Sequence, residues 1–346
     1  MKNRIDLKKF NIRTDLVIDN NIQENYLHKR KINDTILVTS IDVNKQLGKE
    51  LSKKPGNYIT IEFEDITNHE DKLEVTNVLK EEISSLLEKK NLNKEDSCLI
   101  LGLGNNNSTA DSLGPKVLEK IIVTRHLFIL KTNIKKGIRE VSAISPGVMA
   151  NTGIETSDII ISLVNKINPK FLIVIDALAS SSIERINKTI QITDTGIHPG
   201  SGIGNNRKEI SQDTIGIPVI AIGVPTVVES SILVNDTINY FFKHISYIKS
   251  HYEENKLTFG HRNKKKYLEK IKEQNLNEEE KKELSGILGT LDDTKKRELI
   301  SEVLSSINYN MIVTPKEIDF LISKLSDVIS NAINNSLHDA ITNNIK

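Results

Sequence analysis

Two stretches of this chain place an aspartate beyond a run of apolar residues, and this pattern constrains the fold more than any other feature. Phe171 to Ile175 are five apolar residues in a row, and Asp176 follows them. Such a run predicts a buried parallel strand that delivers an acid to its carboxyl end. Cys98 to Leu103 form a second such strand, and Asp111 lies beyond the glycine turn after it. Because open α/β sheets place chemistry at the carboxyl ends of their strands, both aspartates are candidate functional residues.

The remaining pattern alternates strands with helices. We expect further strands at 35–39, 58–63, 140–145, 189–193 and 218–223, and helices at 70–90, 114–125, 157–166 and 230–247. Thr314 to Glu317 have the form of a helix start, with a threonine cap, a proline at the first position and a glutamate at the third. An apolar stripe from Ile318 to Ile329 continues that helix. The sequence therefore predicts an α/β fold, a doubly wound and largely parallel sheet flanked by helices, with a helical C-terminal extension.

Composition narrows the class of protein. The chain has 346 residues, with 47 Lys and Arg against 46 Asp and Glu, so a net charge of +1 gives no reason to expect a nucleic-acid or membrane partner. Its one cysteine, Cys98, excludes an internal disulfide, and its place in an apolar strand favours a buried structural thiol over a nucleophile. No apolar run approaches the roughly 18 residues of a membrane span. We therefore expect a cytoplasmic protein.

The common sequence templates for cofactors and catalysis are not satisfied. Gly102 and Gly104 fit the first two positions of the dinucleotide fingerprint, but Asn107 stands at the third. The sequence has no P-loop, no GxSxG, no HExxH and no paired CxxC motif. We expect no cofactor and no dedicated metal ligand set.

Each aspartate has a structural interpretation as well as a functional one. Asp111 precedes Ser112 and a predicted helix, so it could serve only as a helix cap. Asp176 could cap the turn after its strand. Two carboxylates at one edge of a sheet can instead split their pKa values, so that one acts as acid and the other as base.

A glycine-rich loop from Gly196 to Gly204 is a further candidate site. Its glycines let backbone amides approach a ligand. His198 in this loop could act as an acid, a metal ligand or a structural hydrogen-bonding residue. Candidates for binding substrate or an oxyanion are Asn105, His198, Gly200, Ser201 and Gly202.

Several of these motifs together resemble the germination protease family of spore-forming Firmicutes. The likeness covers nearly the whole chain and rests on Gly102–Asn105 with Thr109–Val117, Ser145–Met149, Asp176–Ala179, His198–Glu209 and Gly223–Val228, together with Lys54–Tyr58 and Met311–Glu317. The chain departs from the family pattern in three places. Asn106 stands where tryptophan is usual, Ala110 where proline is usual and Glu229 where aspartate is common. None of these changes removes a proposed catalytic carboxylate, but Asn106 bears on substrate preference.

The resemblance implies an endopeptidase of an atypical aspartic type, with Asp111 and Asp176 as its essential aspartates. It implies a homotetramer in the spore core that degrades small acid-soluble spore proteins during germination. It also implies a fold similar to that of the hydrogenase maturation peptidases.

The N-terminus resembles the self-processing site of that family. An acidic residue, Asp15, is followed by an aliphatic one, Leu16. Cleavage between them would release a pro-segment of residues 1–15 and leave an α/β core at 16–250 and a mostly helical region at 251–346. The zymogen would then carry a copy of its own substrate motif.

Two other functions are consistent with the same residues. The hydrogenase maturation enzymes bind a metal, and Asp111, Asp176 and His198 could form such a site. The glycine loops could instead belong to a non-catalytic α/β module that binds a nucleotide or a sugar phosphate, although the missing third glycine counts against this.

Overall fold

The protein is described by a computed structural model that covers residues 14–20, 22–199, 208–250, 270–271, 273–309 and 311–342. The chain divides into two compact units. The α/β unit holds the described parts of residues 13–180, 184–227 and 314–346, and a smaller unit holds those of 181–183 and 228–313. The sequence ranges expected above for a pro-segment, a core and an extension stay predictions.

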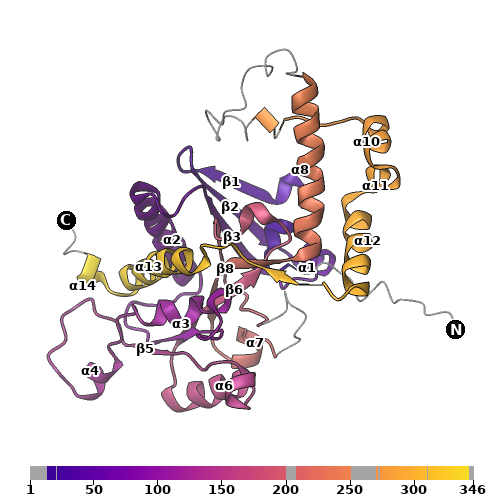
Figure 1. Ribbon diagram of the computed structural model, residues 1–346. Coiled ribbons are helices and arrows are strands. Elements are labelled where there is room, and N and C mark those ends of the chain that lie inside the picture. Colours follow the sequence, from indigo (N-terminus) through magenta and orange to yellow (C-terminus); the bar gives the residue numbers. More distant parts are fainter. Residues whose placement is uncertain are drawn as a thin grey trace. The chain divides into compact units, whose positions relative to one another are not determined.

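A mixed β-sheet forms the centre of the α/β unit (Figure 1). Its order is β1-β2-β3-β7-β8-β6-β4-β5. The bounds are β1 Leu27–Lys31, β2 Ile36–Val43, β3 Gly56–Phe63, β4 Cys98–Gly102, β5 Val141–Ile144, β6 Phe171–Ala179, β7 Thr189–Thr193 and β8 Val219–Glu229. Strands β5, β4, β6 and β8 run parallel, whereas β1, β2, β3 and β7 extend the sheet by antiparallel pairing. The α/β class expected from the sequence is confirmed.

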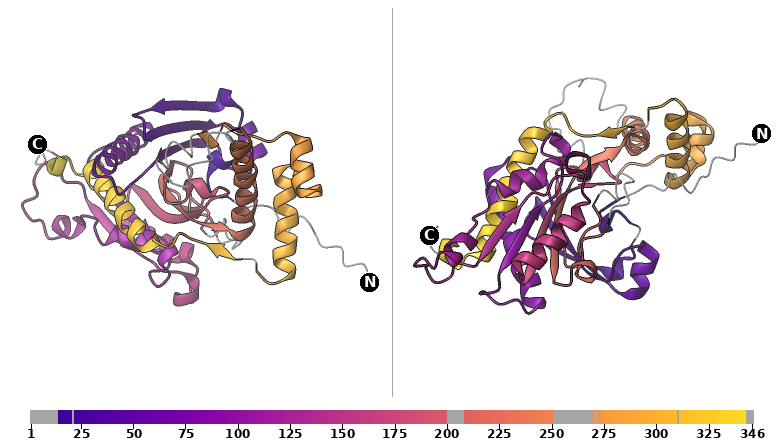
Figure 2. Two further views of the ribbon diagram at one scale, coloured as in Figure 1. Left: turned by 45° about the horizontal axis from the view of Figure 1, so that its top comes forward. Right: turned by 90° about the horizontal axis from the view of Figure 1, so that it is seen from below.

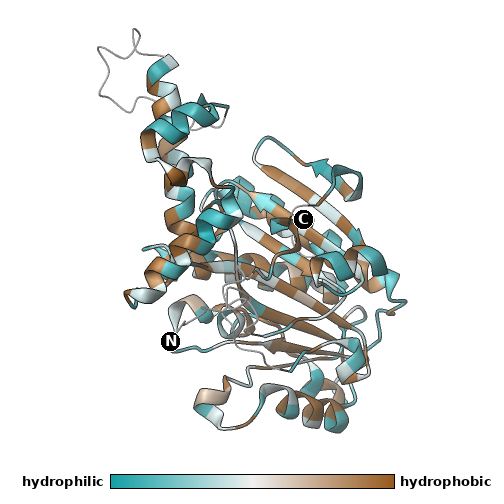
Figure 3. Cartoon of the chain, turned by 90° about the vertical axis from the view of Figure 1, so that its right-hand side faces the viewer, coloured by the Kyte–Doolittle hydropathy of each residue, from teal (hydrophilic) through white to brown (hydrophobic). Residues whose placement is uncertain are grey.

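Helices cover both faces of the parallel strands. Ile100 and Ile173 pack on one face in a core that includes α2 (His69–Lys89), α3 (Leu113–Leu118) and α13 (Ile318–Leu337). Leu101 and Val174, one residue further along their strands, pack on the other face with α6 (Thr156–Ile167). Because side chains alternate between the faces of a strand, a run that is apolar throughout supplies both cores. Figure 3 shows these strands as continuous hydrophobic ribbons.

Helix α13 lies beside α2, as both views of Figure 2 show. Ile322, Leu325 and Ile329 are fully buried on its apolar stripe, and each contributes about 1.5–3 kcal/mol relative to an exposed position. The predicted threonine cap is wrong. The helix begins at Ile318, and the Thr314 hydroxyl donates to the carbonyl oxygen of Thr226 at 2.8 Å. A tertiary hydrogen bond therefore takes the group that would have capped the helix.

The helix predicted over 114–125 is also divided. α3 ends at Leu118, and α4 (Arg125–Ile129) begins after an irregular segment. Thr124 explains the break, because its amide donates to the carbonyl oxygen of Val141 at 3.0 Å and its hydroxyl donates to that of Arg139 at 2.5 Å. The chain leaves the helix to pair with the start of β5.

Short elements complete the α/β unit: α1 (Lys45–Leu51), α5 (Met149–Thr152), α7 (Gln212–Ile215) and α14 (Asp339–Thr342). In the smaller unit, α8 (Ser230–Ser250) packs against α12 (Asp293–Ser306), and α10 (Glu278–Ser285) against α11 (Ile287–Thr290). Strand β9 (Ile312–Val313) pairs with the end of β8. Among the described residues, the helices are too short or too polar for any of them to cross a bilayer.

Candidate active site

The first aspartate is held by the loop that leaves β4. The amide of Asn105 donates to the Asp111 carboxylate at 2.9 Å and to the Asp111 carbonyl oxygen at 3.0 Å. This closure needs glycine at position 104, where φ is +110° and a Cβ atom would lie 2.0 Å from the Asp111 carbonyl oxygen. The N-cap of α3 is Ser112, so the carboxylate of Asp111 is tied to the glycine turn and is not the helix cap.

The turn that carries Asp111 is also anchored from β8. Asp111 ends a 3-10 helix, η4 (Thr109–Asp111), and the Thr226 hydroxyl donates to the carbonyl oxygen of Ala110 at 2.7 Å. Thr226 is fully buried. Its strand therefore fixes the height of η4 above the sheet.

The second aspartate lies inside β6. This strand continues to Ala179, so the expectation that Asp176 ends its strand is wrong, because residues 177–179 go on pairing with β8. Asp176 is 6% exposed, and its carboxylate accepts the amide of Ala177 at 2.9 Å. Asp176 is two residues beyond Val174, so its side chain projects from the same face of the sheet as that of Val174. Helix α6 covers this face nearer the start of β6.

The structure brings both aspartates to the carboxyl edge of neighbouring parallel strands. The amide of Leu103, just past β4, donates to the Ile175 carbonyl oxygen at 2.8 Å, and η4 lies against β6. One carboxylate thus comes from a loop after β4 and the other from β6 itself. Their roles in a reaction stay a prediction.

A row of residues crosses the sheet at the level of Asp176. Asp176 is the register partner of Gly223 in β8, and Gly223 is the partner of Gln191 in β7. Register partners point to the same face, so Gln191 and Asp176 share one side of the sheet with about 10 Å, two strand spacings, between their backbones. The side chain of Leu178 fills the place above Gly223, where a Cβ would meet it at 2.4 Å.

The N-terminal segment is seated at the same edge. The Asp15 amide donates to the Ala179 carbonyl oxygen at 3.0 Å, and the Ala179 amide donates back to the Asp15 carboxylate at 2.9 Å. Leu16 and Val17 are fully buried. The segment is fastened again at Asp19, whose carboxylate accepts the Thr14 hydroxyl at 2.6 Å and pairs with Arg185 at 2.9 Å. The predicted processing bond is thus held three residues along β6 from Asp176.

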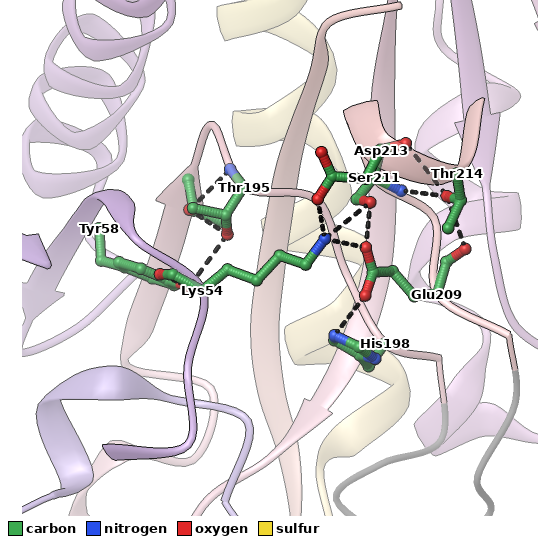
Figure 4. A network of polar contacts seen from close by, with 9 residues as sticks. Lys54, Tyr58, Thr195, His198, Glu209, Ser211, Asp213 and Thr214 are labelled. Atoms are coloured by element: carbon green, nitrogen blue, oxygen red, sulfur yellow. Dashed lines mark hydrogen bonds and ion pairs between the residues drawn. The ribbon is translucent and has the colours of Figure 1, made fainter. Parts of the chain in front are cut away.

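His198 belongs to a different cluster (Figure 4). Its Nε2 lies 3.1 Å from a carboxylate oxygen of Glu209. Lys54 bonds to the same carboxylate and also reaches Ser211 at 3.1 Å and Asp213 at 2.6 Å. Burial opposes ionisation of Glu209, but hydrogen bonds from Lys54 and Ser211 hold its pKa below the ordinary value. The cluster therefore fastens both ends of the loop that holds His198.

The other candidates of that loop, Gly200, Ser201 and Gly202, lie outside the described residues. Within the described part of the chain, no group of three or more His, Cys, Asp or Glu side chains is arranged to hold a metal ion. Cys98 is buried as expected, and burial raises its pKa, which disfavours a reactive thiolate.

A cavity of about 530 Å³ opens beside the glycine turn. The turn Gly104–Asn107 lines one side, and Ala143–Ser145 at the end of β5 lines another. Asn105 stands at its wall, where its side-chain oxygen accepts the Asn107 amide at 3.0 Å and the Asn151 amide group at 3.2 Å. Asn106 also lines this cavity.

Two residues near the N-terminal segment escaped the sequence analysis. Lys53 donates from Nζ to the carbonyl oxygens of Thr14 and Asp15, and Gln191 donates from Nε2 to that of Asp15. Neither residue stands out in the sequence. Lys53 is one of two adjacent lysines, and Gln191 is a polar residue within the alternation of a strand whose neighbours, Ile190 and Ile192, are buried.

Fold and site together define an α/β protein with two carboxylates at the carboxyl edge of its parallel strands. Residues 9–346 match the germination protease family. Germination proteases of Bacillus cereus (strain B4264) and Geobacillus sp. (strain WCH70) are 45% and 44% identical to the chain, over 99% of its length and 97% of theirs. The chain therefore belongs to the germination protease family and is a peptidase.

A solved structure is also similar in part. It is a hydrogenase maturation protease from Thermococcus kodakarensis KOD1, 17% identical, with a TM-score of 0.27 over 42% of this chain and 80% of that one.

Proposed function

We propose that this peptidase is an aspartic-type endopeptidase that degrades small acid-soluble spore proteins during germination. We propose further that it is made as a zymogen which cuts itself between Asp15 and Leu16. The observation that carries the proposal is the pairing of Asp15 with Ala179 at the end of β6, three residues along the strand from Asp176. This segment carries the acidic–aliphatic motif expected of a substrate and lies near a carboxylate site, with Leu16 extended and Val17–Asp19 in a short 3-10 helix.

In this mechanism Asp111 and Asp176 act as a pair. One carboxylate takes a proton from water as the water attacks the peptide carbonyl, and the other protonates the departing amine. A coupled pair titrates as a unit, so neither role is assigned to one aspartate. We also propose that the peptidase acts in the spore core and assembles as a homotetramer. Sedimentation of the purified chain tests the tetramer.

Because the chain belongs to the germination protease family, a peptidase is favoured over the non-catalytic binding module. The metal-dependent alternative would need His198 beside both aspartates, and the contact between His198 and Glu209 gives it no support.

The direct test of self-processing is the intact mass of the full chain held in mildly acidic, dehydrating conditions. Loss of residues 1–15 is expected for the unchanged chain and not for Asp111→Asn or Asp176→Asn, each folded by circular dichroism. Retention of Met1 by the unchanged chain, or cutting by either variant, would contradict the proposal.

A further inference from the structure

The carbonyl group of Asp15 accepts hydrogen bonds from two side chains that come from distant parts of the chain. Lys53 Nζ lies 3.2 Å from its oxygen, and Gln191 Nε2 lies 3.3 Å from it. This carbonyl is the one that would be attacked if the chain cuts itself between Asp15 and Leu16. We propose that Lys53 and Gln191 form the oxyanion hole for that cleavage, an inference that rests on the proposed self-processing.

Both donors come from structured positions of the α/β unit. Gln191 is 6% exposed in a central strand, and its other side-chain atom, Oε1, accepts the Val17 amide at 2.8 Å. One amide group thus binds the chain on both sides of the Asp15–Leu16 bond. Lys53 follows Ser52, which ends α1 in a left-handed conformation, and the Lys53 amide donates to the Gly48 carbonyl oxygen at 2.9 Å. Preorganised donors of this kind lose little by reorganising when charge develops.

The charge on Lys53 suits the role. Desolvation lowers the pKa of its ammonium group, while the negative charges of Asp15 and Asp19 act in the opposite direction. A partly desolvated cation stabilises a nearby developing anion more strongly than an exposed one does. The same cation favours an acidic residue before the cut. The Ala179 amide donates to the Asp15 carboxylate at 2.9 Å and so recognises it directly.

Gln191 and Asp176 lie in one row on one face of the sheet, on either side of Gly223, and the Leu178 side chain fills the place above Gly223. Attack as proposed therefore places the water between the Asp15 carbonyl and the carboxylates at the rim of this row. Water would add to the Asp15 carbonyl carbon and give its proton to one carboxylate, and the oxygen would become the anion held by Lys53 and Gln191. Collapse would break the bond to the Leu16 nitrogen, which takes a proton from the other carboxyl group. The products are a chain that ends in the new α-carboxyl group of Asp15 and a chain that begins with the α-amino group of Leu16.

The alternative is that both residues only hold the segment in place. The test is the rate at which the full chain converts to residues 16–346, followed by intact mass, for Lys53→Met and Gln191→Glu. Lys53→Arg is the matched control, because it keeps a cationic donor, and Gln191→Glu keeps the oxygen that accepts the Val17 amide. We expect each donor loss to slow cutting by about 10²–10³-fold, and Lys53→Arg to retain most of the rate.

Seating is measured separately, by hydrogen exchange of residues 14–20 in chains that also carry Asp176→Asn and so stay uncut. We expect protection of this segment to fall by less than about tenfold in Gln191→Glu, which loses one hydrogen bond, and by less than about thirtyfold in Lys53→Met, which loses two. Cutting within threefold of the unchanged rate would overturn the inference alone. A loss of cutting that only parallels a loss of protection would assign the residues to seating and overturn it too. An unchanged chain that is cut at another bond, or not at all, would instead refute the self-processing proposal and the inference with it.

Discussion

Replacing Gly104 with alanine should disable the site although both aspartates stay unmutated. A Cβ atom at this position would lie 2.0 Å from the Asp111 carbonyl oxygen, so the η4 turn must move by at least about 1 Å to relieve the contact. The backbone at φ +110° adds strain of about 1–3 kcal/mol for any residue but glycine. A displacement of about 1 Å at a catalytic group costs on the order of 10²-fold in rate. We therefore expect Gly104→Ala to lose about 3 kcal/mol of stability and about 100-fold in kcat.

The assay pairs urea unfolding with the rate of cleavage of a small acid-soluble spore protein. Gly153→Ala is the matched control, because Gly153 also has a positive φ, +71°, but a Cβ there would meet nothing within 4 Å. It should lose only about 1 kcal/mol and keep its activity. If Gly104→Ala cleaved at the unchanged rate, or if Gly153→Ala lost as much activity, the argument that this turn positions Asp111 would be refuted.

Two further changes test other parts of the structure. Thr226→Val removes the 2.7 Å hydrogen bond to the Ala110 carbonyl oxygen. We expect the free energy of unfolding in urea to fall by about 1 kcal/mol and cleavage to slow. Unchanged activity would show that Thr226 does not position Asp111. Asp327 is partly buried, which raises its pKa, but hydrogen bonds from Lys120 and Lys72 hold the pKa below its ordinary value. Because the folded pKa is lowered, these pairs stabilise the fold above about pH 4 and lose their effect as the pH falls through the lower value. Asp327→Asn should therefore cost about 1 kcal/mol at pH 7 and progressively less below pH 4, and a difference that did not depend on pH would contradict this.

Most strands could be predicted because their signal is local. Runs such as Phe171–Ile175 are apolar throughout since both faces of the parallel strands are buried. Boundaries depended on distant partners instead. β6 runs on past Asp176 because residues 177–179 pair with β8. The helix expected to begin at Pro315 begins three residues later, at Ile318, because the Thr314 hydroxyl bonds to Thr226.

The site divides in the same way. Asp111 and Asp176 could be chosen from the sequence because each lies beyond a run of apolar residues, and the structure brings them to one edge of the sheet. Gln191 could not, because its place in the row with Asp176 depends on the strand order β7-β8-β6, which no local pattern encodes. His198 could be singled out from the sequence, but its contact with Glu209 depends on the pairing of Ile197 with Ile210, which no local pattern encodes.

The central claim is that Asp111 and Asp176 carry out peptide hydrolysis, and one measurement tests it most directly. A small acid-soluble spore protein is incubated with the self-processed chain, with and without a chelator, and the products are read by mass spectrometry. We predict a single cut after an acidic residue and before an aliphatic or aromatic one, unaffected by the chelator and absent with folded Asp176→Asn. A cut that survives in that variant, or one that the chelator abolishes, would contradict the account.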